Sequence, residues 1–191
     1  MPIGVFLLMR QKIEEEIQIP EGITCELENK TLICKKDSYS ISRDFSKSNV
    51  SISLSENKII LKCEKANKKQ FKVLKSISAH IKNMFKGLNS PFVYKLEICH
   101  VHFPMNIKVD KDQLIISNFL GEQKPRIAKI VPGVKVEIKG QNIILSSPEI
   151  EKAGQTATNI EKATKISKRD RRIFQDGIFI VEKPLRGENE N

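Results

Sequence analysis

An internal repeat is the feature that most constrains how this chain can fold. Apolar positions in the first half recur in the second half 84 residues later, as Val50 does at Val134 and Ile60 at Ile144. A fixed offset over several segments indicates a duplicated structural unit. The sequence therefore predicts two copies of one small domain. The matched positions are Ile19-Pro20 with Phe103-Pro104, Ile23 with Ile107, Val50, Ile52 and Leu54 with Val134, Val136 and Ile138, and Ile59, Ile60 and Leu61 with Ile143, Ile144 and Leu145.

The repeated segments have the pattern of β-hairpins. Residues 50–54 and 134–138 alternate apolar with polar side chains, which is typical of strands with one buried face and one solvated face. Asn57 and Gly140 follow these segments and are residues that favour hairpin turns. Each copy is therefore predicted to contain an antiparallel sheet.

An amphipathic helix is predicted after each hairpin, because apolar residues change there to spacings of three and four. In the first copy we expect Gly87 to end the helix. In the second copy we expect Ser147 to cap the helix and Pro148 to occupy its first position. The two apolar stripes are Leu74, Ile77, Ile81, Met84 and Leu88, and Ile150, Ala153, Ala157 and Ile160.

The predicted fold class is α+β, with two tandem, duplicated domains, each an antiparallel β-sheet packed against one α-helix. Turn residues Asn89-Ser90-Pro91 follow the first helix and mark the boundary between the copies. We predict an N-terminal extension at residues 1–12, a first repeat at 13–90, a second repeat with a basic C-terminal segment at 91–183, and a tail at 184–191.

The charge of the chain indicates the class of its partner. The formal net charge is +10, and such an excess attracts polyanions over long distances. Nucleic acid is the predicted partner. Anionic lipid is the alternative, but no apolar run approaches the roughly 20 residues that span a bilayer, so we expect no membrane partner.

The termini and cysteines favour a cytoplasmic protein. The apolar segment from Ile3 to Met9 is short and leads into charged residues rather than a cleavage site, so we interpret it as mature protein. Cysteines lack both a CxxC motif and a regular framework, which predicts reduced thiols and disfavours disulfides. They are Cys25, Cys34, Cys63 and Cys99.

Two basic clusters and a strand region are candidate RNA-binding surfaces. Lysines recur at helical spacing along the first predicted helix, although such a face is also typical of an ordinary solvated surface. Arginines gather beyond the second helix, and guanidinium groups can bridge phosphate oxygens. The candidates are Lys68, Lys72 and Lys75 on the first helix, Lys165, Lys168, Arg169, Arg171 and Arg172 beyond the second, and Lys124, Arg126 and Lys129 around the strand loops.

The remaining residue patterns do not support an enzyme. Gly121, Pro132 and Gly133 are predicted turn residues without phosphate-loop spacing. In a strand, His100 and His102 would face away from Cys99, and no fourth metal ligand is evident. Serine residues lack a nucleophile-elbow context. We therefore predict no catalytic residue, no metal, no cofactor and no small-molecule substrate.

Several short motifs occur in one order between about Ile17 and Lys183. They are Arg43-Asp44-Phe45, His80 with Asn83-Met84 and Lys86-Gly87, His102-Phe103-Pro104-Met105-Asn106, Asn118-Phe119-Leu120-Gly121-Glu122, Pro132-Gly133-Val134, and Phe174 with Asp176-Gly177-Ile178. In these motifs the sequence resembles the eukaryotic and archaeal branch of a universal family of large-subunit ribosomal proteins, called L-six in bacteria and L-nine in eukaryotes.

The sequence also departs from that family. At Lys36, Asp37, Ser38 and Tyr39 the first domain of the family usually has a Gly-Pro-x-Gly hairpin, so this chain lacks the residues best suited to a positive φ. Arg171 and Gln175 replace residues that are usually apolar in the eukaryotic branch.

The resemblance implies two duplicated domains and binding to large-subunit ribosomal RNA, mainly through the second domain. It further implies a site near the sarcin-ricin loop, with neighbouring ribosomal proteins as partners and translational GTPases docking nearby. We therefore expect a structural constituent of the cytoplasmic ribosome. The alternatives are a free RNA-binding regulator of translation with the same fold and, third, a small hydrolase or metal-dependent enzyme.

Overall fold

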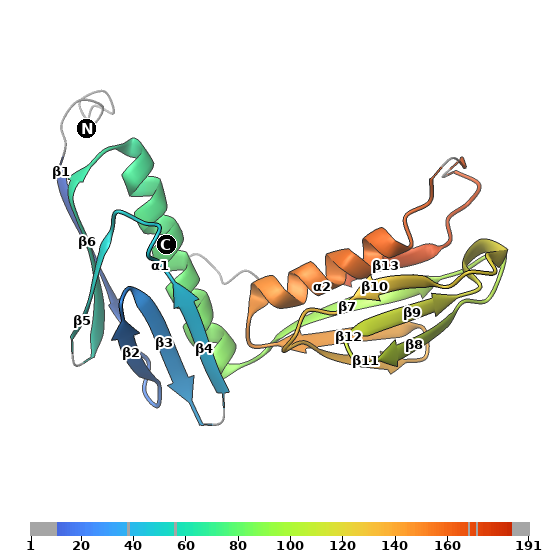
Figure 1. Ribbon diagram of the computed structural model, residues 1–191, viewed down its shortest axis with the longest axis horizontal. Coiled ribbons are helices and arrows are strands. Elements are labelled where there is room, and N and C mark those ends of the chain that lie inside the picture. Colours follow the sequence, from blue (N-terminus) through green and yellow to red (C-terminus); the bar gives the residue numbers. More distant parts are fainter. Residues whose placement is uncertain (1–10, 38, 56, 168, 171, 185–191) are drawn as a thin grey trace. The chain divides into compact units, whose positions relative to one another are not determined.

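The chain forms two compact units, Met1–Ser90 and Pro91–Asn191, in the computed structural model (Figure 1). The structure describes all residues except 1–10, 38, 56, 168, 171 and 185–191. Most of the predicted tail and most of the predicted extension therefore lie outside the described residues. Each unit has a hydrophobic core of its own.

Unit 1 contains two three-stranded antiparallel sheets and one helix. The strands lie in the orders β1-β6-β5 and β2-β3-β4. Leu32 of β3, Leu61 of β6 and Leu74 of α1 belong to one buried cluster, so both sheets and the helix share the core. The elements are β1 (Gln11–Gln18), β2 (Thr24–Glu28), β3 (Thr31–Lys36), β4 (Tyr39–Asp44), β5 (Ser51–Ser55), β6 (Lys58–Ala66) and α1 (Lys68–Asn89).

Unit 2 repeats this arrangement and adds a strand. Its sheets have the orders β11-β12-β7-β13 and β10-β9-β8, and α2 packs against both. The elements are β7 (Phe92–Cys99), β8 (Asn106–Asp110), β9 (Gln113–Ser117), a 3-10 helix (Phe119–Gly121), β10 (Arg126–Lys129), β11 (Lys135–Lys139), β12 (Asn142–Ser147), α2 (Ile150–Ala163) and β13 (Gly177–Glu182).

The α+β fold class and the duplication are confirmed, with two sheets in each unit where one was predicted. The order β1-β6-β5 recurs as β7-β12-β11. Ile52 lies opposite Leu61, and Val136 lies opposite Leu145 in the same way. Positions 84 residues apart are therefore equivalent in the predicted hairpins.

A constant offset of 84 is wrong for the earlier strands. Leu27 pairs with Leu32 in unit 1, and Val109 pairs with Leu114 at the corresponding place in unit 2. Leu114 is therefore the equivalent of Leu32, and the two lie 82 positions apart in the sequence. Ile23 precedes β2 and is not equivalent to Ile107, and the proposed match of residues 19–20 with 103–104 fails for the same reason. Loops tolerate insertions and deletions, so the offset changes from one connection to the next.

The first apolar stripe is buried in the core of unit 1, and Ala153, Ala157 and Ile160 of the second stripe are buried in unit 2, whereas Ile150 is only partly buried. The predicted helix ends are wrong. Gly87 is buried inside α1, which continues to Asn89 because Leu88 is also buried in the core. Packing of an apolar face, more than local propensity, sets how far a helix extends. The N-terminal end of α1 is fixed by Asn67, whose side chain accepts the backbone N–H groups of Lys69 and Gln70.

The start of α2 also differs from the prediction. Glu149 is its N-cap and Ser147 is still in β12. The Ser147 hydroxyl accepts the N–H of Glu149 and donates to the Gly133 carbonyl, so it joins the strand end to the turn before β11.

None of the described helices combines the length and apolar character that crossing a bilayer requires.

The turn that departs from the family pattern is a tight hairpin between β3 and β4. Lys36 pairs with Tyr39, which leaves two residues in the loop. Asp37 has a φ of 49°, in the left-handed region. Aspartate tolerates this region better than most residues, so the turn can form without glycine. Ser38 lies outside the described residues.

Candidate nucleic-acid interface

Three loops of unit 2 meet at one end of its sheets. They are residues 100–105 between β7 and β8, residues 118–125 between β9 and β10, which include the 3-10 helix, and residues 164–176 between α2 and β13 (Figure 1, right). We call this the loop end, and we call residues 164–176 the basic loop. Antiparallel pairing of β7 with β12 and β13 brings these connections together.

The basic loop is anchored where it leaves α2. Thr164 is buried, and its hydroxyl donates to the Glu161 carbonyl at 3.2 Å. The same oxygen accepts the backbone N–H of Ile178 at 2.9 Å. The start of the loop is therefore bound to the first residues of β13, which follow its other end.

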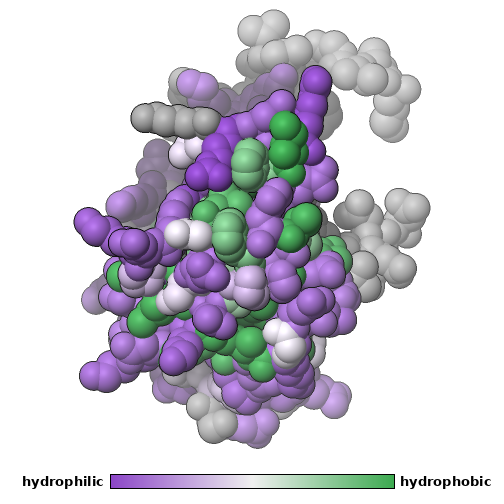
Figure 2. All heavy atoms as spheres, turned by 90° about the vertical axis from the view of Figure 1, so that its right-hand side faces the viewer, coloured by the Kyte–Doolittle hydropathy of each residue, from purple (hydrophilic) through white to green (hydrophobic). Residues whose placement is uncertain are grey.

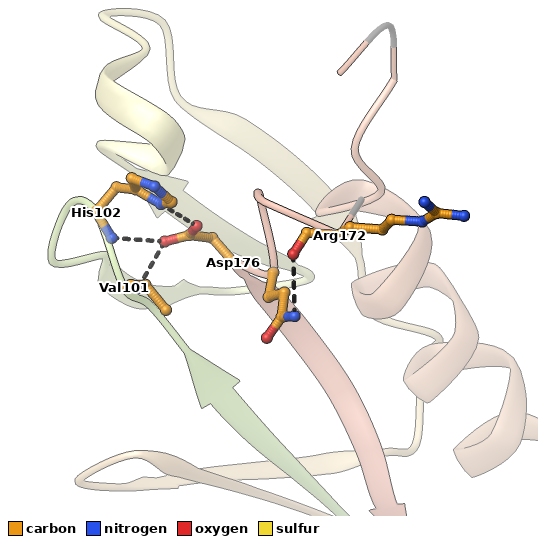
Figure 3. A network of polar contacts seen from close by, with 5 residues as sticks. Val101, His102, Arg172 and Asp176 are labelled. Carbon is orange, nitrogen blue, oxygen red and sulfur yellow. Dashed lines mark hydrogen bonds and ion pairs between the residues drawn. The ribbon is translucent and has the colours of Figure 1, made fainter. Parts of the chain in front are cut away.

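The second anchor is Asp176, whose side chain is almost fully buried (Figure 3). Its carboxylate accepts the backbone N–H groups of Val101 at 2.8 Å and His102 at 3.1 Å. His102 Nδ1 lies 2.7 Å from the other carboxylate oxygen. Burial raises the pKa of Asp176, but the hydrogen bonds from His102 and Val101 outweigh it and hold that pKa below its ordinary value. An ionised carboxylate thus joins the basic loop to the loop before β8.

A turn inside the basic loop shapes its arginine-bearing part. The Asp170 carboxylate accepts the N–H of Arg172 at 2.9 Å, and the Asp170 carbonyl accepts the N–H groups of Ile173 and Phe174. Gln175 donates its side-chain amide to the Arg172 carbonyl at 3.2 Å. The Arg172 side chain extends away from the Asp176 network, and Figure 3 shows this direction.

Arg169 is held by an aromatic ring. Its guanidinium carbon lies 4.9 Å from the centroid of Phe174, a distance typical of a cation–π contact. The Phe174 ring is also stacked with His102, with centroids 5.0 Å apart. Arg169 remains exposed while its position is fixed by the same residues that surround Asp176.

Arg126 has a different role from the one expected. It binds the Glu122 carboxylate with two hydrogen bonds of 2.8 and 2.6 Å, and its Nη1 donates to the carbonyls of Ala163 and Lys165. Its guanidinium also lies 4.2 Å from the Phe119 centroid. The hydrogen bond from Arg126 lowers the pKa of Glu122. With four N–H groups used inside unit 2, Arg126 positions β10 against the basic loop.

The other candidates of unit 2 are surface residues. Lys165, Arg169 and Arg172 are exposed on the basic loop, and Lys124 is exposed before β10. Lys129 is exposed at the far end of β10. Lys168 and Arg171 lie outside the described residues. The fold therefore brings together the candidates from two separate sequence regions, because Arg126 contacts the carbonyl of Lys165.

The candidates on α1 belong to unit 1. Lys68, Lys72 and Lys75 are all exposed. Lys75 lies 3.1 Å from a carboxylate oxygen of Glu15 in β1, so its charge is partly neutralised within the unit. Lys68 and Lys72 keep the helical spacing that the sequence indicated.

The expected geometry of the histidines is corrected by the structure. β7 ends at Cys99, so His100 and His102 lie in the following loop and not in a strand. His102 Nδ1 lies 2.7 Å from Asp176 Oδ2. No group of three or more potential metal ligands occurs among the described residues. His102 and Asp176 belong to two of the quoted motifs, but nothing in the sequence indicates that they contact each other.

The loop end also exposes hydrophobic side chains. Figure 2 faces this end of unit 2 and shows hydrophobic residues among hydrophilic ones. Val101, Phe103 and Ile173 are exposed in its loops. The surface thus offers apolar contacts beside its cations.

Comparison with known proteins places this geometry in a family. The family model for ribosomal protein L6 matches residues 103–177, which contain most of the loop end. A large ribosomal subunit protein uL6 from Aeropyrum pernix is 43% identical over 174 residues, covering 91% of this chain and 96% of the relative. The uL6 protein of Methanobrevibacter smithii is 41% identical and covers 93% and 99%, and that of Sulfurisphaera tokodaii is 42% identical and covers 92% and 95%.

The chain belongs to the ribosomal protein L6 family. The archaeal relatives confirm the resemblance to the eukaryotic and archaeal branch that the motifs indicated. Membership of a family of ribosomal proteins also supports a role without catalysis. In this L6-family chain, the family match ends at Gly177, directly after the carboxylate that anchors the basic loop.

Proposed function

We propose that this L6-family chain is a structural constituent of the large ribosomal subunit and binds large-subunit rRNA through the loop end of unit 2. The named relatives are large ribosomal subunit proteins. The observation that carries the proposal is a pair of exposed arginines, Arg169 and Arg172, on a loop anchored at both ends by buried groups. The proposed binding residues at the loop end are Lys124, Lys165, Lys168, Arg169, Arg171 and Arg172. Lys129, at the other end of β10, and Lys68, Lys72 and Lys75 on α1 are proposed as further RNA-binding surfaces, and Arg126 has a positioning role.

The net charge of the chain and the anchoring of the basic loop both favour RNA binding. The net charge of +10 attracts the RNA before contact. Binding then releases counterions from the phosphates that the arginines and lysines approach. Because the basic loop is already held by Thr164 and Asp176, less conformational freedom is lost when it binds.

The proposed location follows from the family resemblance alone. We propose that the chain lies near the sarcin-ricin loop in the cytoplasmic ribosome, beside the region where translational GTPases dock. Exposed Val101, Phe103 and Ile173 suit contacts with neighbouring ribosomal proteins at the rim of the RNA interface.

The test is the salt dependence of binding to a large-subunit rRNA fragment. Replacing Arg169 and Arg172 with glutamine should weaken binding and flatten the log–log salt slope by about 1.5 units, at roughly 0.7 to 0.9 per phosphate contact. Adding Arg171→Gln should flatten it by about two units in total. Thermal melts should change little, since exposed side chains contribute about 0.5 kcal/mol or less to stability.

A matched control removes the same charge elsewhere in unit 2. Lys108 and Lys111 are exposed on the β8–β9 hairpin, and the turn of this hairpin lies away from the loop end. Their replacement by glutamine should leave the slope nearly unchanged. Equal slopes for wild type and the arginine variant would contradict the proposed interface. Failure to co-sediment with large subunits in high salt would instead indicate a free RNA-binding regulator.

A further inference from the structure

Two cysteines of unit 1 face each other across β2 and β3. Cys25 and Cys34 are directly opposed in the antiparallel register, and their Sγ atoms are 3.2 Å apart. Opposed residues in such pairs have Cα atoms about 4.5 or 5.5 Å apart, and disulfides span about 4.4 to 6.8 Å between Cα atoms. Both thiols are free. A bond between them therefore requires movement of the side chains and little movement of the backbone.

The two thiols differ in access and acidity. Cys25 is partly exposed, whereas Cys34 is fully buried in the core of unit 1. The hydrogen bond from Cys34 lowers the pKa of the Cys25 thiol. The same hydrogen bond and burial raise the pKa of Cys34. Because the thiolate is the nucleophile in thiol chemistry, Cys25 is the residue that an oxidant meets first.

We propose that Cys25 and Cys34 form a thiol–disulfide exchange site whose oxidant is a small disulfide compound. The Cys25 thiolate attacks one sulfur of the compound, which forms a mixed disulfide and releases one thiolate. Cys34 then loses its proton and attacks Cys25 Sγ, which releases the second thiolate. Two cysteine thiols are oxidised to one disulfide, and the compound is reduced to two thiols that take up the two protons.

The other cysteines do not have this arrangement. Cys63 is buried in unit 1, and Cys99 is in unit 2 at the end of β7. Nine positions separate Cys25 from Cys34, so no short motif marks them in the sequence. Only the strand register brings them together.

The disulfide would act on unit 1. It would join β2 to β3, the central strand of the β2-β3-β4 sheet. A crosslink restricts the unfolded chain, so oxidation should raise the unfolding midpoint of this unit. The site lies in unit 1, whereas the basic loop belongs to unit 2.

Peptide mapping tests the proposal on the full chain. The protein is incubated with oxidised glutathione, its remaining thiols are blocked, and it is digested with trypsin. Cleavage after Lys12, Lys30 and Lys35 separates Cys25, in residues 13–30, from Cys34, in residues 31–35. The expected product is these two peptides joined by a disulfide, at a mass two hydrogen atoms below their sum.

Two variants serve as controls. Cys99→Ser should give the joined peptides unchanged, and Cys25→Ser should abolish them. Recovery of both peptides separately with blocked thiols would overturn the proposal. A glutathione adduct that persists on Cys25 would also overturn it, because Cys34 would then have failed to attack. Every cysteine-containing peptide is observed in the same digest, so a folding defect in one variant does not affect the result for wild type.

Discussion

At the scale of single residues, one carboxylate connects two loops of unit 2. Asp176 accepts three hydrogen bonds from Val101 and His102, and it precedes the strand that the basic loop leads into. A buried donor that loses its partner costs about 1 to 3 kcal/mol. Asp176 carries no positive charge and is buried, but it anchors the end of the loop that carries Arg169 and Arg172.

We predict that Asp176→Asn lowers the free energy of unfolding by about 1 to 3 kcal/mol. The amide keeps one oxygen for the backbone donors but loses the acceptor for His102 Nδ1. RNA affinity should also fall, because the loop becomes less ordered, whereas the salt slope should stay close to that of wild type. Chemical denaturation and salt titration measure the two effects. An affinity equal to that of wild type would show that the anchor does not position the loop.

The ionisation of Asp176 leads to a prediction about how the stability of the protein depends on pH. The pKa of Asp176 is lowered in the folded state, so its ionised form contributes stability above the unfolded value and loses it as pH falls through the folded value. The stability difference between wild type and Asp176→Asn should therefore persist near neutral pH and narrow below about pH 4, near the ordinary carboxyl range. Denaturation of both proteins from pH 7 to pH 2.5 checks this. A constant difference over that range would contradict it.

At the scale of elements, hydrogen bonds from Arg126 connect β10 to the end of α2. A lysine cannot reproduce its two bonds to Glu122 together with its bonds to the carbonyls of Ala163 and Lys165. We predict that Arg126→Lys destabilises unit 2 by about 1 to 3 kcal/mol and leaves the salt slope of RNA binding unchanged. Melting curves and salt titrations separate the two roles. A flatter slope with unchanged stability would make Arg126 a phosphate contact instead.

The elements also show what the sequence could predict. The alternation in residues 50–54 and 134–138 and the helical stripes depend on burial of one face and were predictable from the local sequence pattern. Pairing of β13 with β7 joins Ile178 to Ile98, and no local pattern encodes a contact between such distant residues. Among the candidate site residues, the cations were visible in the sequence. The anchors Thr164 and Asp176 were not, because their partners become neighbours only in the fold.

At the scale of the whole molecule, a strong net charge is combined with few aromatic residues in the proposed interface. The chain has two tyrosines and no tryptophan. Phe103 is the one exposed phenylalanine among the described residues of the loop end. Phe174 is the one aromatic residue of the basic loop, and its ring is already stacked with His102 and in contact with Arg169. Proteins that grip single strands use free aromatic rings on which bases stack. The interface therefore favours phosphates held in place by RNA structure.

We predict that the protein prefers a folded large-subunit rRNA fragment to an unstructured oligonucleotide of equal length. Both ligands carry the same number of phosphates, so the general attraction of a +10 chain applies to both. Only the folded fragment presents phosphates in a fixed arrangement that matches a loop held by Thr164 and Asp176. Competition binding at several salt concentrations should show the folded fragment displacing the oligonucleotide at every concentration. A tight and sequence-selective grip on the oligonucleotide would show that bases, rather than the RNA backbone, are recognised.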